Sequence, residues 1–177
     1  MKCSNCVGVL SAARELFNEK NNEKFYLTEI EFNGVRFPLV ASEFLLDGVE
    51  GKVELKMYIR SESRNERLFT FLYAMNIDAV DPSTPDLNKV AIGGQVKSSG
   101  GLRTTENVGL QVLPFTVTYA SYDGNKSVAH CLGRAKTARQ LKGLEEGDVI
   151  ELEGSLQLKR TTIQVLVKEV LSLTKRN

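Results

Sequence analysis

The chain has 177 residues, 42% hydrophobic and 25% charged, with three cysteines, one histidine and no tryptophan. This composition is typical of a soluble globular protein of one or two domains. No apolar stretch is long enough to span a membrane and no signal sequence opens the chain, so we expect a cytoplasmic protein. One histidine leaves little material for acid–base catalysis, and the odd cysteine count argues against a disulfide scaffold.

The first half predicts one helix followed by strands. Apolar residues recur at helical spacing between Val7 and Lys20, so we expect an amphipathic helix there. Asn33-Gly34 is a strong hairpin signal between two of the segments that follow. Four segments have the alternating or continuous apolar pattern of strands: 25–32, 35–41, 53–59 and 68–80.

A proline-rich break follows these strands. Pro82 and Pro85 lie among two acidic and two hydroxyl residues, a composition that cannot form a regular element. We therefore expect a linker at 82–87 between an N-terminal unit, 1–81, and a C-terminal domain, 88–177.

The second half predicts strands at 89–96, 111–119, 127–132, 148–158 and 162–173. A helix is expected at 134–141, between the third and fourth strands. Five strands with a helix at that place form the layout of an OB barrel.

A loose internal echo connects the two halves. The segment 48–55 (GVEGKVEL) resembles 143–152 (GLEEGDVIEL) after a one-residue shift. We therefore expect a mainly β fold: a C-terminal five-stranded OB barrel preceded by a smaller helix-plus-β, OB-like unit.

Three segments of the second half resemble the bacterial single-stranded DNA-binding protein family, including its primosomal relative. They are 88–96 (NKVAIGGQV), 131–141 (CLGRAKTARQL) and 146–156 (EGDVIELEGSL). The last segment follows the family's fourth strand most closely. The resemblance implies an OB fold over 88–173 that binds single-stranded DNA, with Gly93 and Gly154 where strands bend around the barrel.

Charge divides unevenly along the chain. Residues 1–87 carry 10 basic and 14 acidic side chains, whereas residues 88–177 carry 13 and 8, giving −4 and +5. A basic half joined to an acidic half is expected when only one half binds a polyanion. The alternative interpretation is a chance imbalance of charge between two small domains.

Binding of a single strand requires cations for phosphates and aromatic faces for bases. The candidates in loops, turns and strand ends are Lys97, Arg103, Lys126, Lys159 and Arg160, with Phe115, Tyr119 and Tyr122 as stacking rings. A phenylalanine on a strand is also a common core residue. The helix cations Arg134, Lys136, Arg139 and Lys142 are either a phosphate track or a solvated helix face.

Two further clusters have competing interpretations. Arg60, Arg64 and Arg67 lie beside aromatic residues and could extend a nucleic-acid path, or could form ion pairs with the interleaved Glu62 and Glu66. Separately, Cys3 and Cys6 form a CxxC pair, but structural zinc requires four ligands, so we expect no metal site.

The sequence thus predicts a non-enzymatic protein without cofactor that binds single-stranded DNA with little sequence preference. Replication, recombination or primosome-type processes fit this activity, with replication or recombination proteins as partners and a homo-oligomer as a further expectation. The alternatives are a protein–protein adaptor that docks a replication partner and an RNA-binding OB protein.

Overall fold

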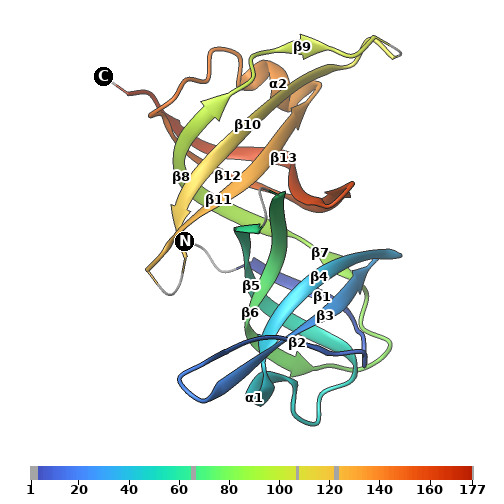
Figure 1. Ribbon diagram of the computed structural model, residues 1–177. Helices are drawn as coiled ribbons and strands as arrows, with labels where there is room; N and C mark the ends of the chain where they lie inside the picture. The colour runs from blue at the N-terminus through green and yellow to red at the C-terminus, as the bar shows by residue number, and fades with distance from the viewer. Residues whose placement is uncertain (1–3, 65–66, 107, 122–123, 177) are drawn as a thin grey trace. The chain divides into compact units, whose positions relative to one another are not determined.

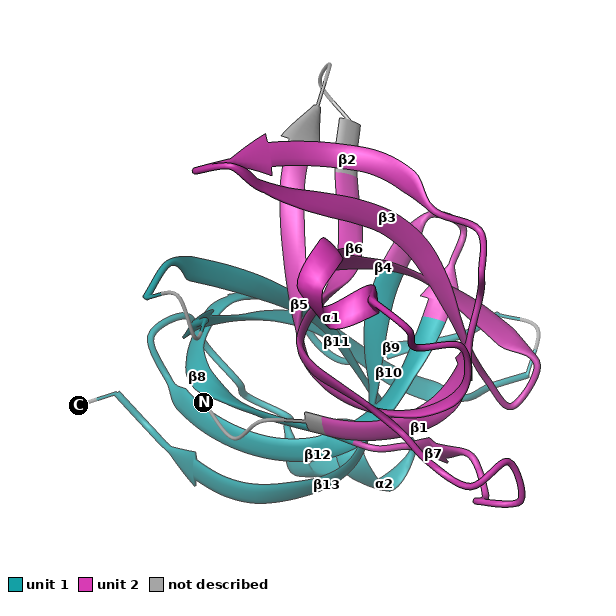
Figure 2. Ribbon diagram, turned by 90° about the horizontal axis from the view of Figure 1, so that it is seen from below, with its two compact units in different colours: residues 1–2, 90–157, 163–177 teal, residues 3–89, 158–162 magenta. Residues whose placement is uncertain are grey.

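The computed structural model describes residues 4–64, 67–106, 108–121 and 124–176. They form two compact units (Figure 2). Unit 1 contains 1–2, 90–157 and 163–177, and unit 2 contains 3–89 and 158–162. No helix in the described part of the chain is long and apolar enough to cross a membrane.

Unit 1 is built on a closed barrel, as predicted (Figure 1). Its strands are β8 Val90–Ser99, β9 Arg103–Thr104, β10 Gln111–Ala120, β11 Lys126–Arg134, β12 Val149–Lys159 and β13 Thr162–Thr174. They follow the order β11-β13-β12-β8-β10-β9, and the β10–β11 pairing closes the barrel. Helix α2, Lys136–Gln140, lies between β11 and β12. The parallel pairing of β11 with β13 completes OB connectivity.

Two glycines let strands of this barrel approach closely. A Cβ on Gly94 would lie 2.2 Å from the Thr118 carbonyl oxygen, and one on Gly154 would lie 2.4 Å from that of Leu166. A Cβ on Gly93 would meet nothing nearer than 3.4 Å. The prediction for Gly154 therefore agrees with the close strand approach there. In the first strand of the barrel, however, the close approach is at Gly94 and not at the predicted Gly93.

Unit 2 has the same connectivity. Its barrel strands are β1 Ser4–Leu10, β3 Glu23–Phe32, β4 Val35–Ser42, β5 Gly51–Arg64 and β6 Arg67–Ala79. Strand β1 pairs with both β3 and β5, which closes the ring, and β4 runs parallel to β6. Helix α1, Glu43–Leu46, occupies the place that α2 has in unit 1. At the β3–β4 turn Asn33 and Gly34 have φ of 50° and 79°, which confirms the predicted hairpin.

The helix predicted at 7–20 is wrong. Its residues form β1 and the edge strand β2, Glu15–Lys20. Pairing with distant strands overrides the local periodicity, and Cys6, Val7 and Leu10 are buried in the strand. A Cβ on Gly8 would lie 2.4 Å from the Glu31 carbonyl oxygen, so the strand crosses β3 too closely for any other residue.

The proline-rich segment is attached to unit 2. Asp86 accepts hydrogen bonds from the Asn33 backbone N–H at 2.5 Å and from Lys52 Nζ. The hydrogen bond from Lys52 is the main cause that lowers the pKa of Asp86. Strand β7, Leu87–Asn88, then pairs with β1. The division between the two units falls after Lys89.

Candidate nucleic-acid interface

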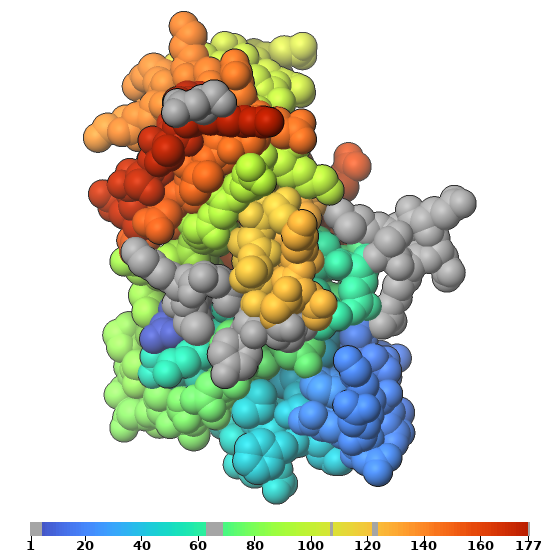
Figure 3. Space-filling model, turned by 90° about the vertical axis from the view of Figure 1, so that its left-hand side faces the viewer, coloured from blue at the N-terminus to red at the C-terminus, as the bar shows by residue number. Residues whose placement is uncertain are grey.

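A groove of about 430 Å³ lies on the surface of unit 1. Its lining residues are Gln95, Val96, Lys97, Thr118, Lys126, Val128, Glu146, Gly147 and Arg176. Figure 3 views the side on which β8 (yellow-green), the β10–β11 hairpin and the C-terminal segment (red) reach the surface. The groove thus brings together residues that are far apart in the sequence.

Three cations lie along this groove. Lys97 comes from β8, Lys126 begins β11, and Arg176 follows β13; all three are exposed. Glu146 is the one acidic residue among the lining residues. Within the described ranges no carboxylate forms an ion pair with Lys97 or Lys126. The groove therefore offers an excess of positive charge to an anionic ligand.

Backbone hydrogen bonds fix one wall of the groove. The Val96 N–H donates to the Asp148 carbonyl at 2.8 Å, and the Gly147 N–H donates to the Val96 carbonyl at 2.9 Å. Gln95 Nε2 donates to the Gly147 carbonyl at 3.3 Å. The loop before β12 is thus held against β8, which orients Lys97 beside it.

Asp148 holds the C-terminal segment. Its carboxylate accepts hydrogen bonds from Lys175 Nζ at 2.8 Å, the Glu145 N–H at 2.9 Å and the Arg176 N–H at 3.1 Å. The hydrogen bond from Lys175 is the largest cause that lowers the pKa of Asp148 to about 2. This anchor places Arg176, a residue that the sequence analysis missed, at the groove.

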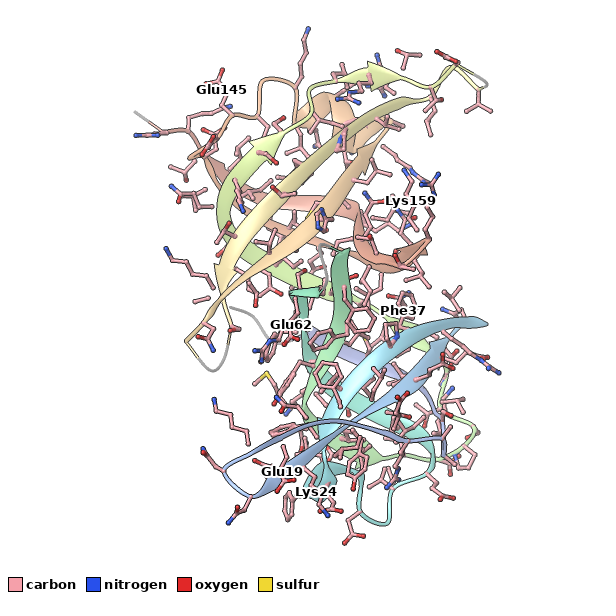
Figure 4. All side chains as sticks on the ribbon, viewed as in Figure 1. Glu19, Lys24, Phe37, Glu62, Glu145 and Lys159 are labelled. Carbon is pink, nitrogen blue, oxygen red and sulfur yellow. The ribbon has the colours of Figure 1, made fainter. Side chains whose placement is uncertain are left out.

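The predicted cations separate into three groups. Lys97 and Lys126 line the groove. Arg103 is exposed on β9 and donates from Nε to the Gly100 carbonyl at 3.0 Å, outside the groove lining. Lys159, labelled in Figure 4, and Arg160 are exposed at the β12–β13 turn, which belongs to unit 2.

Two of the predicted stacking rings are buried, which corrects that expectation. Phe115 is 3% exposed and Tyr119 is 5% exposed, because both share the inward face of β10 with Leu113 and Val117. Neither ring offers a face to a base. Tyr122 lies outside the described residues.

Partly exposed aromatic rings occur instead in unit 2. Tyr73 and Phe25 are partly exposed, with ring centroids 6.0 Å apart. Tyr73 also stacks on its cross-strand partner Tyr58, which is only 4% exposed, with centroids 5.2 Å apart. The Arg60 guanidinium lies 5.6 Å from the Tyr73 ring centroid and also pairs with Glu62 at 3.4 Å. Figure 4 labels Glu62 on β5. This ion pair agrees with the second interpretation of the arginine cluster; the side chains of Arg64, Arg67 and Glu66 lie outside the described part.

Two of the three cysteines lie in the described part of the chain. Cys6 and Cys131 are buried thiols whose pKa burial raises, to about 11 for Cys6. Cys3, the other half of the CxxC pair, is not among the described residues. Within those residues no three histidine, cysteine or acidic side chains gather in a way that could hold a metal ion.

No family model matches the sequence, and no curated protein matches it either. Solved structures do match. A deletion mutant and the wild type of the single-stranded DNA binding protein from Thermus aquaticus superpose with TM-scores of 0.74 and 0.73, at 17% and 16% identity. Each match covers 100% of this chain, and 95% and 94% of those chains. This likeness shows a shared fold along the whole chain.

A smaller likeness covers half of the chain. PriB from Ralstonia solanacearum matches with a TM-score of 0.43 at 18% identity, over 48% of this chain and 96% of that one.

Proposed function

We propose that this protein binds single-stranded DNA with little sequence preference, and that the groove of unit 1 holds the sugar–phosphate backbone. The observation that carries the proposal is the convergence of Lys97, Lys126 and Arg176 on one groove of an OB barrel. Flexible cations along a groove can follow a backbone whose phosphates repeat regularly. Residues 88–177 would then be the binding domain.

Two independent facts support this proposal. The half of the chain that carries the groove has a net charge of +5, whereas the other half has −4. Two solved structures that share the fold along the whole chain are of a single-stranded DNA binding protein. Replication, recombination and primosome-type processes expose single-stranded DNA. We therefore propose that the protein acts in one of these processes, in the cytoplasm.

Fluorescence anisotropy with a labelled dT oligomer tests the proposal. The double variant Lys97→Glu/Lys126→Glu should bind roughly tenfold or more weakly than the wild type, because both phosphate contacts become repulsive. Lys136→Glu/Lys142→Glu is the matched control: it makes the same change in charge on exposed residues of unit 1 that do not line the groove. The control should bind nearly as the wild type does.

Equal losses in the two variants would reject the groove as the site and leave only a general effect of charge. An RNA oligomer of the matching sequence, added as competitor, separates the DNA-binding proposal from an RNA-binding function. Sizing chromatography of the same samples would reveal a homo-oligomer.

A further inference from the structure

A row of uncharged polar side chains crosses unit 1. The Ser98 and Thr116 hydroxyl oxygens lie 2.7 Å apart, Thr116 is the register partner of His130, and His130 is the register partner of Gln164. Gln157 Nε2 donates to Gln164 Oε1 at 2.9 Å. These five residues, here called the polar band, come one each from β8, β10, β11, β13 and β12.

The polar band faces outward. Thr116, His130 and Gln164 each lie between two buried residues of the barrel core, and Gln157 follows the buried Leu156. Ser98 has no buried neighbour along β8, but it is the register partner of Thr116 at the irregular β8–β10 pairing. Successive side chains of a strand point to opposite faces, so the polar band lies on the outer surface. Ser98 is exposed, and the other four are partly exposed.

The polar band adjoins the groove. Lys97, which lines the groove, directly precedes Ser98. Thr118 and Val128 also line the groove, and each lies two residues along its strand from the polar band, a distance of about 7 Å. The Lys97 charge contributes, after burial, to lowering the pKa of His130, so the two features are within electrostatic range.

We propose that the polar band contacts the bases of a single strand held in the groove, through hydrogen bonds to base edges rather than through stacking. This inference rests on the proposed function and deepens it. The two rings predicted for stacking on β10 are buried in the barrel, whereas the polar band is available on the adjoining surface.

The polar band offers both hydrogen-bond donors and acceptors. The Gln164 carbonyl oxygen is occupied by Gln157, which leaves the Gln164 amide N–H groups to donate. Neutral His130 adds one donor and one acceptor nitrogen, and the hydrogen bond between Ser98 and Thr116 leaves one of their two O–H groups to donate elsewhere. Groups of both kinds can pair with the donors and acceptors on base edges, including O2 and O4 of thymine.

The test compares a dT oligomer with an abasic oligomer of the same length. The wild type should bind the dT oligomer more tightly. Thr116→Val/Gln164→Leu should lose most of that difference, roughly tenfold for two lost hydrogen bonds, and should bind the abasic oligomer within about twofold of the wild type. Gln164→Met, a nearly isosteric single variant, should lose part of the difference with only a small decrease in Tm, because it removes the hydrogen bond from Gln157.

The outcomes separate the two claims. If the band variants weaken both oligomers equally, or neither, the polar band does not contact bases and the inference fails while the groove stands. If the wild type binds neither oligomer, the proposed function fails and the inference with it. Lys97→Glu is the contrasting control, since it should weaken both oligomers by the same factor.

Discussion

Lys175 donates a hydrogen bond from Nζ to Asp148 Oδ2 at 2.8 Å, across 27 positions of sequence. The Asp148 side chain is only 3% exposed and also accepts from two backbone N–H groups. A buried carboxylate that accepts from three donors is a strong local anchor, because without these hydrogen bonds its charge would be buried unsatisfied. This anchor connects the end of β13 to the groove.

Asp148→Asn should therefore destabilise the protein by about 1–3 kcal/mol, because Lys175 loses its counter-charge and the amide cannot accept all three hydrogen bonds. The pKa of Asp148 is about 2 in the folded protein against 3.8 ordinarily, so the wild-type carboxylate stabilises the fold above pH 3.8. That contribution is lost as the pH falls through about 2. Urea unfolding between pH 2 and pH 6 measures both effects. A variant as acid-sensitive as the wild type would contradict the role of Asp148.

Gly94→Ala and Gly93→Ala form a matched pair. The added methyl at Gly94 would lie 2.2 Å from a backbone oxygen of β10, whereas at Gly93 it meets the flexible Glu151 side chain at 3.4 Å. We expect Gly94→Ala to cost about 1–3 kcal/mol or more, and Gly93→Ala to have little effect. Thermal unfolding of the two variants measures this difference, and similar Tm values would show that the strands do not approach as described.

The aromatic packing of unit 2 gives a further stability test. Phe71 is fully buried and packs edge-on against Phe17, with ring centroids 5.3 Å apart. Phe71→Ala should cost about 3–5 kcal/mol. Phe44, which is 84% exposed, provides the control: Phe44→Ala should change stability by no more than about 0.5 kcal/mol. Denaturant midpoints for the two variants measure this difference. Equal midpoints would contradict the packing of Phe71 in the core against Phe17 of β2.

His130 should make stability depend on pH near neutrality. Burial, and secondarily the Lys97 charge, lowers its pKa below 6.5. As the pH falls below 6.5, His130 becomes protonated in the unfolded chain before it does so in the folded one. The free energy of unfolding therefore decreases with falling pH, until the pH is below the pKa of His130 in the folded protein. His130→Gln should remove this decline. Chemical unfolding at pH 5 and pH 7.5 checks it, and a decline that persists in His130→Gln must come from another group.

Local patterns predicted the strands of unit 1 well, because period-two alternation and turn residues are properties of neighbouring positions. The same patterns failed at 7–20, where apolar spacing fits a helix but the residues form β1. The pairing of β1 with β5, whose partner residues are 41 to 53 positions away, decides its conformation. Unit 2 therefore has the complete five-strand barrel connectivity, rather than only a reduced one.

The candidate site was partly predictable for similar reasons. Lys97 and Lys126 follow from their places at strand ends, which OB topology brings to one side. Arg176 could not be predicted in this way, because the hydrogen bond from its backbone N–H to Asp148 fixes its position. Period two correctly put Phe115 and Tyr119 on one face, but it could not tell the inward face from the outward one.

The salt dependence of dT binding tests the central claim most directly. Each phosphate contact on a single strand contributes about −0.7 to the slope of log affinity against log salt, so three groove cations should give a slope of about −2. Arg176→Ala should make the slope shallower by about 0.7. The same slope in the wild type and in Arg176→Ala would remove Arg176 from the interface. An affinity for dT that stays constant with salt would contradict backbone binding in the groove altogether.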